Sequence, residues 1–221
     1  MGVRKMSEMH PSVLNGKILD GYTLHVANVF PGRFVEETNF ELYLKAADGA
    51  VSENPVVKGK YFSGRGKFYK PWLEIYYDNI SRFKPSKTVN LSENNLDEKL
   101  FKHLTSLIPS GSHIMVFYSN DKETRKGLER GVPAPATPIG YLLWKSGCTW
   151  FKDWYFAEGF LEGDVKLQGS KPVNEKYRQK NLLEISRVLD EFLKKEKSED
   201  ELFVRARRRA REIITSIKSF H

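Results

Sequence analysis

The sequence predicts an α/β (α+β) fold: a mixed, mostly antiparallel sheet with one parallel step near its centre, followed by a two-helix appendage. Three observations predict it. Strand-like segments separated by short turns fill the first third of the chain, a helical pattern followed by a buried strand occupies the middle, and two amphipathic helices end it. The 221 residues are 40% hydrophobic and 13% aromatic, which is enough to build a core.

Four strands are predicted in the first third. Residues 22–30 alternate loosely between apolar and polar side chains and stop at a Pro-Gly turn signal, residues 31–32. Residues 40–44, 56–62 and 72–77 are further runs of strand length, rich in aromatic and β-branched residues. Because the turns between them are short, we expect an antiparallel meander.

The middle of the chain changes to the helical period. Apolar residues recur at helical spacing over 96–108, Asn95 followed by Glu98 is an N-cap signature, and Pro109 ends the helix. Residues 113–118 form an apolar run of strand length. Its position after a helix predicts a central strand that is parallel to the strand before that helix.

Two helices and two strands complete this part of the chain. Residues 121–131 predict a short helix. Thr137, followed by a proline, combines an N-cap hydroxyl with the residue favoured at the first helical position, and the helix it begins ends at Gly147. Residues 149–156 and 165–168 are predicted strands.

A domain boundary is predicted at Pro172, which gives a mixed-sheet domain over 1–172 and a basic helical hairpin over 173–221. Apolar residues at helical spacing define two helices in the hairpin, and Ser198 with Glu201 forms a capping box for the second. At 100° per residue, three arginines fall on the side of that helix away from its apolar stripe: Arg205, Arg208 and Arg209.

The net charge of +8 is unevenly spread, because residues 171–221 hold 14 basic and nine acidic residues. A basic tail is compatible with anionic partners, namely nucleic acid, a phosphorylated cofactor or a membrane surface. The interspersed acidic residues favour a solvated helical face instead. The single cysteine, Cys148, excludes a disulfide framework and a Cys-rich metal site, and the histidines show no metal-ligand spacing, so no metal is expected.

Other features of the sequence concern location and source. The N-terminus has no apolar signal region, and no apolar run approaches the roughly 20 residues of a membrane helix, so we expect a cytoplasmic protein without membrane contact. Abundant Lys and Glu with only two Gln favour a heat-adapted source.

One stretch points to function. Over 150–155 the sequence is Trp-Phe-Lys-Asp-Trp-Tyr, and glycines follow it. On a strand, alternate side chains share a face, which places Trp150, Lys152 and Trp154 together and Phe151, Asp153 and Tyr155 opposite. Because unpaired buried charges are costly, we expect a substrate groove with aromatic walls, lined also by Gln168. The alternative interpretation is an edge strand with an extended Lys152 and an exposed Asp153.

This order of elements resembles the GNAT-type N-acyltransferase fold over residues 40–168, in which acetyl-CoA sits in a splay between two central parallel strands. The resemblance implies acetyl-CoA or another acyl-CoA as ligand, with 72–77 and 116–118 beside the splay and a pyrophosphate site in the loop 79–95. That loop holds no glycine. Three cationic side chains of the loop are therefore expected to bind the pyrophosphate: Arg82, Lys84 and Lys87.

Acyl transfer to an amine needs a base for the nucleophile and an acid for the leaving thiolate. The candidate bases are Glu74, Asp153 and Glu158. The candidate acids are Tyr118, Tyr141 and Tyr155. Residues 123–171, which carry the Trp-Phe-Lys-Asp-Trp-Tyr signature, also resemble an uncharacterised, largely archaeal protein family without an established activity.

Two non-enzymatic interpretations remain open. The first is a nucleic-acid-associated protein that uses Arg205, Arg208 and Arg209, with stacking aromatics interleaved with Lys and Arg over 58–69. The second is an oligomer, in the simplest case a homodimer, whose tail helices pair between subunits. A small-molecule ligand is the partner that the sequence favours.

Overall fold

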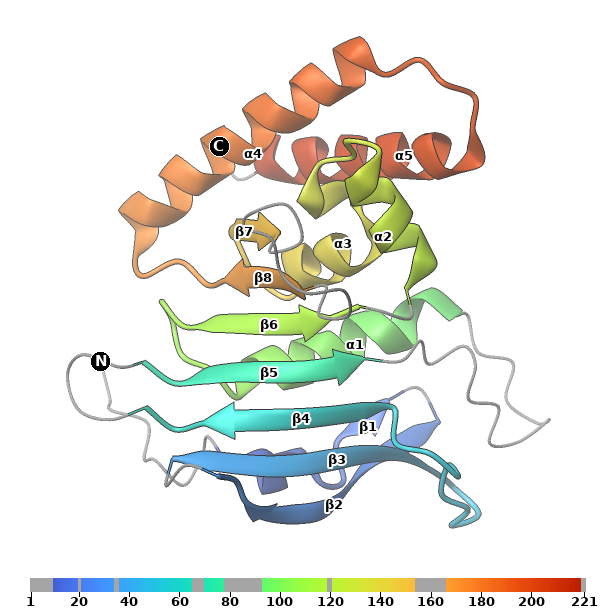
Figure 1. Ribbon diagram of the computed structural model, residues 1–221, viewed down its shortest axis with the longest axis vertical. Coiled ribbons are helices and arrows are strands. Elements are labelled where there is room, and N and C mark those ends of the chain that lie inside the picture. The colour runs from blue at the N-terminus through green and yellow to red at the C-terminus, as the bar shows by residue number, and fades with distance from the viewer. Residues whose placement is uncertain are drawn as a thin grey trace.

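The computed structural model describes residues 10–19, 21–33, 36–64, 70–77, 93–118, 121–153 and 166–219. It is an α+β structure built on one eight-stranded sheet of strand order β1-β2-β3-β4-β5-β6-β8-β7 (Figure 1). Every neighbouring pair is antiparallel except β5 with β6. The predicted mixed sheet with one parallel step is therefore confirmed.

The first five strands form the expected meander. Their bounds are β1 Ile18–Leu19, β2 Tyr22–Pro31, β3 Glu37–Ala46, β4 Val57–Phe62 and β5 Trp72–Tyr77, after a short 3-10 helix, η2, at Pro11–Leu14. Alternation holds along β4, where Val57 and Tyr61 are buried and Lys58 is exposed. Gly59 lies against the ring of Phe40, and a Cβ there would come within 2.3 Å of that ring. The close approach explains a glycine in mid-strand.

The crossover between β5 and the parallel strand β6, His113–Phe117, is the helix α1, Glu93–Ser106. Apolar residues at helical spacing on α1 pack into the main core, among them Leu100, Phe101 and Leu104. In Figure 1, α1 lies behind β5 and β6, and the described helices lie behind the sheet or beyond its upper edge. The opposite face of the sheet is therefore not covered by a described helix.

After β6 the chain forms α2, Lys122–Glu129, the 3-10 turn η4, Ala134–Ala136, and α3, Pro138–Lys145. The predicted N-cap of α3 is confirmed, because the Thr137 hydroxyl accepts a hydrogen bond from the amide of Gly140. Two short strands follow, β7 at Trp150–Asp153 and β8 at Lys166–Ser170, and β8 inserts between β6 and β7. This insertion makes β7 the edge strand.

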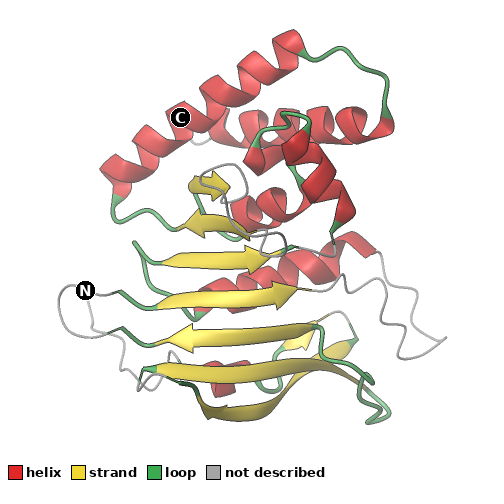
Figure 2. Ribbon diagram, in the orientation of Figure 1, coloured by secondary structure: helices red, strands yellow, loops and turns green. Residues whose placement is uncertain are grey.

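The last two helices form an antiparallel hairpin, α4 at Glu175–Lys195 and α5 at Glu201–Lys218, which crosses the β7 end of the sheet (Figure 2). Their apolar faces form a second cluster that also takes in Val132, Ala136 and Trp144. The two helices thus share a core with the η4–α3 region of the same chain.

A carboxylate of α2 ties α5 to the sheet domain. Glu123 accepts from Arg209 at 2.9 Å and lies 3.2 Å from a guanidinium nitrogen of Arg205. The Arg209 side chain is only 14% exposed. The predicted exterior position of these arginines is wrong for Arg205 and Arg209, because the hairpin docks with one flank of its apolar stripe against α2.

Two predicted helix starts differ from the structure. Helix α1 begins at Glu93, so Asn95 lies within its first turn and is not the N-cap. The N-cap of α5 is Asp200, whose carboxylate accepts a hydrogen bond from the amide of Leu202. The hydroxyl of Ser198 accepts a hydrogen bond from the amide of Asp200 and so lies outside the helix. Both stretches carry several residues that suit caps and first turns, so the pattern fixes the region and not the starting residue.

The central strands also correct an expectation. Four consecutive register pairs, from Leu73 with Ile114 to Tyr76 with Phe117, join β5 and β6. The expected splay is therefore absent along 73–76 and 114–117. Both strands are apolar on the α1 side, and continuous pairing satisfies their backbone groups next to a dry core.

The Glu123 contact predicts a measurable loss of stability. Glu123→Gln keeps the shape and removes the charge shared by the two arginines, and we expect a loss of about 1–2 kcal/mol in the free energy of unfolding, because the site is only partly exposed. Glu191→Gln is the matched control, since Glu191 pairs with Arg187 on exposed α4, and it should cost about 0.5 kcal/mol or less. Urea unfolding measures both, and equal losses would contradict this role of Glu123.

Candidate functional site

The sheet sorts the predicted site residues onto two faces. We call the face turned away from α1 the outer face; Trp72, Glu74 and Tyr76 of β5 belong to it. Across β5, β6, β8 and β7, the register aligns Glu74, Met115, Gln168 and Lys152 in one row. Glu74, predicted as a base, and Lys152 and Gln168, predicted to line the substrate groove, therefore lie on one face and in one line, which we call the central row.

Aromatic side chains flank the central row on both sides. On one side, Trp72 stacks on Phe62 at 4.3 Å and on His113 at 5.9 Å between ring centroids. On the other, Tyr76 stacks on Phe117 at 4.1 Å, and the ammonium group of Lys166 lies 4.6 Å from the Phe117 ring. The stacked rings therefore form flat aromatic surfaces on both sides of the charged groups of the central row.

Glu74 supplies the carboxylate of the central row. It is half-buried, and among the described residues none forms a hydrogen bond or ion pair with it. Its cross-strand neighbour Lys60 pairs instead with the buried Glu37, at 3.3 Å. A half-buried carboxylate between rings is suited to accept a proton or to bind an ammonium group.

The second group lies on the α1 side, where β6 and β7 end. The Tyr118 hydroxyl donates a hydrogen bond to Asp153 Oδ1 at 3.2 Å. Tyr118 is 1% exposed, and Asp153 is half-buried. The prediction that residues 150–153 form an edge strand is confirmed. The prediction that Asp153 is exposed is wrong, because β7 turns this side chain toward the covered face.

The contacts of the tyrosines revise their roles. Burial, then the charge of Asp153 and the hydrogen bond to it, raises the pKa of Tyr118 well above its usual value. In the same way, burial and the hydrogen bond to Glu212 raise the pKa of Tyr141. Both phenols therefore keep their protons at neutral pH and orient a carboxylate, so they are poor proton donors to a leaving thiolate.

Other predicted residues lie beside the central row or outside the described part of the chain. Trp150 is on the face of Lys152, one register row away opposite Ser170, and also lines an apolar groove of about 350 Å³ with Pro133 and Val188. Others lie outside the described residues: Trp154, Tyr155, Glu158, Arg82, Lys84 and Lys87. The Tyr118–Asp153 pair and the central row occupy opposite faces, so the sequence candidates form two groups and not one.

The arginines proposed for nucleic acid are all near carboxylates. Arg205 and Arg209 contact Glu123, and Arg208 lies 3.9 Å from Glu212. Arg205 also pairs with Glu201 one turn away on α5. Much of the positive charge of this helix is therefore engaged in holding the hairpin.

The described residues contain neither a metal-binding cluster nor a membrane-spanning helix. Among the described residues, no group of three or more His, Cys, Asp or Glu side chains is placed to hold a metal ion. No described helix is long and apolar enough to cross a membrane. Cys148 is fully buried, and burial raises the pKa of its thiol to about 12, which agrees with a packed hydrophobic role.

Comparison with known proteins identifies the family. A sequence model described as a protein of unknown function, DUF1122, matches residues 20–196. The chain belongs to the DUF1122 family. The match runs from β2 to the end of α4 and stops before α5. The expected membership of an uncharacterised family is confirmed.

A solved structure resembles this DUF1122 protein along most of its length. A crystal structure of a protein of unknown function from Aquifex aeolicus VF5 aligns with a TM-score of 0.67 at 27% sequence identity, and the alignment covers 89% of this chain and 93% of the other. No curated protein matches the sequence.

Sequence reasoning missed several members of the outer face. Met115, Trp72 and Lys166 were assigned to strands without a role, although strand alternation already placed Trp72 beside Glu74. What the sequence lacks is the register between strands, which brings Met115 and Gln168 next to Glu74.

The Tyr118–Asp153 contact is testable through pH. Tyr118→Phe removes a donor from a half-buried carboxylate and should cost about 1–3 kcal/mol at neutral pH. The pKa of Tyr118 is raised in the folded protein, so above about pH 10 the phenol ionises in the unfolded chain while it stays protonated in the folded one. The free energy of unfolding therefore falls as the pH rises further. The variant should show a shallower fall in urea unfolding across that range.

The exposed Tyr177 of α4 provides the control. Tyr177→Phe should change the free energy of unfolding by about 0.5 kcal/mol or less. If Tyr118→Phe is equally neutral and follows the same alkaline decline as the parent protein, the described contact has no energetic role.

Proposed function

We propose that the protein is an acyltransferase-like enzyme that transfers an acyl group from an acyl thioester, of the acyl-CoA class, to an amine bound on the outer face of the sheet. The observation that carries the proposal is the half-buried Glu74 carboxylate, which lies among aromatic rings and has no partner among the described residues. Glu74 is the proposed base.

The arrangement of the strands supports a GNAT-like architecture. A single parallel pair, β5 and β6, lies inside an otherwise antiparallel sheet, with α1 as its crossover. In open sheets that contain parallel strands, ligands favour the region beyond the carboxyl ends of those strands. Glu74 lies two residues before Tyr76, the last paired residue of β5, so it is roughly 7 Å from that edge.

The surround of Glu74 supports an amine as acceptor. An alkylammonium group is attracted both by a carboxylate and by the faces of Trp72 and Tyr76, and Tyr76 is 46% exposed. The indole N–H of Trp72 is buried and has no hydrogen-bond partner within the part of the chain that the structure describes, so a ligand oxygen near it would satisfy an otherwise costly donor.

The proposed reaction balances with these groups. Glu74 takes a proton from the ammonium group, and the neutral amine attacks the thioester carbonyl. The new C–N bond forms, the C–S bond breaks, and the electron pair of that bond leaves on sulfur. The new amide nitrogen gives up its second proton to water, the thiolate takes up a proton from water in exchange, and Glu74 returns its proton to solvent at this open face. Lys166 and Lys152, on the same face, favour the developing negative charge.

The donor is proposed to approach from the carboxyl edge of β5 and β6. The two strands are paired up to Tyr76 and Phe117, which leaves no room for a pantetheine chain between them along that length. An acyl group that reaches past Phe117 over the outer face would meet an amine held at Glu74. The pyrophosphate contacts of Arg82, Lys84 and Lys87, and an archaeal, heat-adapted source, stay predictions.

Glu74→Gln tests the assignment. With acetyl-CoA and a panel of spermidine, tyramine and a lysine-containing peptide, the parent protein should release free thiol in an amine-dependent manner. Loss of a general base should lower that rate about 10²- to 10⁴-fold, while the rise in melting temperature caused by acetyl-CoA is retained. A thiol assay and a thermal-shift assay give the two readouts.

Glu41→Gln is the matched control, because Glu41 lies on the outer face two strands away and pairs with Lys58. It should keep the parent rate. No thermal shift with acetyl-CoA and no transfer to any amine of the panel would refute the proposed function, whereas full activity of Glu74→Gln would refute only the role of Glu74.

A further inference from the structure

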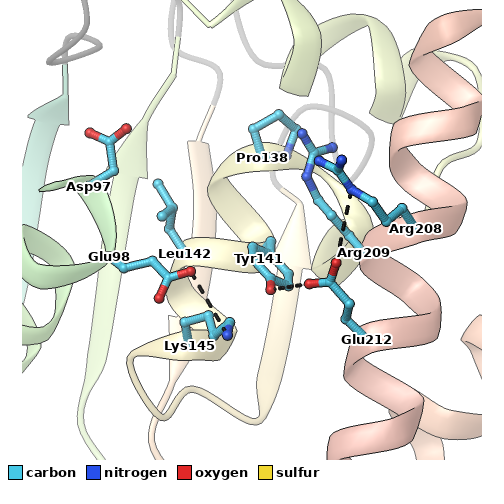
Figure 3. Close-up of a pocket in the computed structure, with 9 residues that line it drawn as sticks. All are labelled: Asp97, Glu98, Pro138, Tyr141, Leu142, Lys145, Arg208, Arg209 and Glu212. Carbon is cyan, nitrogen blue, oxygen red and sulfur yellow. Dashed lines mark hydrogen bonds and ion pairs between the residues drawn. The ribbon is translucent and has the colours of Figure 1, made fainter. Parts of the chain in front are cut away.

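A polar pocket lies on the covered side of the protein, away from the central row. It has a volume of about 510 Å³ and lies open to solvent between α1, α3 and α5, three helices from distant parts of the sequence (Figure 3). Its lining residues are Asp97, Glu98, Pro138, Tyr141, Leu142, Lys145, Arg208, Arg209 and Glu212. A cavity of this size falls in the range of small-molecule sites.

Two of the three acidic groups that line the pocket accept hydrogen bonds from tyrosines. The Tyr77 hydroxyl donates to Asp97, and the Tyr141 hydroxyl donates to Glu212 at 2.5 Å. The Tyr141–Glu212 hydrogen bond joins α3 to α5 across the pocket, as Figure 3 shows. These contacts fix the walls and reduce the number of free acceptors for a cationic ligand.

Two of the cationic groups are less engaged. Lys145 Nζ lies 3.9 Å from Glu98, and Arg208 Nε lies 3.9 Å from Glu212. Both distances exceed hydrogen-bond length. The Lys145 side chain is 39% exposed and that of Arg208 is 67% exposed. In contrast to Asp97 and Glu212, these cations retain donors for a ligand, and Glu98 is the carboxylate that a ligand at Lys145 would face.

The backbone that carries Arg208 is held in place. Its neighbour Arg209 donates to Glu123 at 2.9 Å and to the carbonyl oxygen of Ala136 at 3.4 Å. In Figure 3, the guanidinium groups of Arg208 and Arg209 lie at one end of the pocket, Lys145 lies at the other, and Tyr141 stands between them. The cations thus sit at both ends of a preformed cavity.

We propose that this pocket binds a small phosphorylated molecule, with Arg208 and Lys145 as its phosphate contacts and the Tyr141 ring and Leu142 beside its uncharged part. A phosphate group carries up to two negative charges at neutral pH and accepts hydrogen bonds in several directions. It therefore suits donors that converge from different helices. Arg presents a fork of donors and Lys a mobile point charge, a combination that matches phosphate oxygens.

Isothermal titration calorimetry at low ionic strength, with inorganic pyrophosphate and AMP as probes, tests the proposal on the full chain. Arg208→Gln and Lys145→Gln should each weaken binding of at least one probe roughly tenfold or more. Arg187→Gln is the matched control, because it removes the same charge from exposed α4, and it should bind like the parent protein. Circular dichroism checks that each variant is folded.

Each remaining outcome counts against the proposal. Failure of both probes to bind the parent protein overturns it, and so does binding that Arg208→Gln and Lys145→Gln leave unchanged. If binding is lost only in the combined Arg82→Gln, Lys84→Gln and Lys87→Gln variant, the phosphate contacts belong to the segment 79–95 and not to the pocket. Citrate that binds while both phosphate probes fail shows a carboxylate site. The Glu74→Gln variant should bind both probes normally, so this test and the acyl-transfer test fail independently.

Discussion

The parallel pairing of β5 with β6 is the constraint on which the rest of the structure depends. Parallel neighbours cannot be joined by a tight turn, so the chain must cross one face of the sheet, and α1 is that crossover. Leu73, Ile75, Ile114 and Val116 are fully buried on this covered face. Strand alternation then turns Glu74 and Met115 to the outer face, so the same pairing creates both the core and the proposed site.

Local signals carried most of the fold prediction. Apolar spacing located α1, the Thr-Pro pair located the start of α3, and alternation placed Lys152 and Asp153 on opposite faces. The strand order could not be predicted from the sequence, because no local pattern indicates that β8 inserts between β6 and β7. That insertion places Gln168 beside Met115, whereas alternation along β6 and β7 puts Tyr118 and Asp153 on the opposite face from the central row.

The C-terminal hairpin shows why a charge pattern is a weak guide to a partner. A helical projection places Arg205 and Arg209 away from the apolar stripe, yet both reach Glu123 on α2. Arginine side chains reach several ångströms beyond the helix surface. When a helix docks through its apolar face, arginines beside that face can therefore still contact carboxylates of the neighbouring element. Only Arg208 among the three is mostly exposed, and it borders the pocket.

Methionine-methyl NMR tests the outer-face site most directly. Met115 stands in the central row between Glu74 and Gln168, and the other three methionines lie within the first nine residues of the sequence. In a protein labelled at the methionine methyl carbons, titration with tyramine in the presence of acetyl-CoA should shift the Met115 resonance in a saturable way, and Glu74→Gln should abolish the shift. A Met115 signal that stays fixed while the amine is acylated would place the reaction elsewhere and contradict the account.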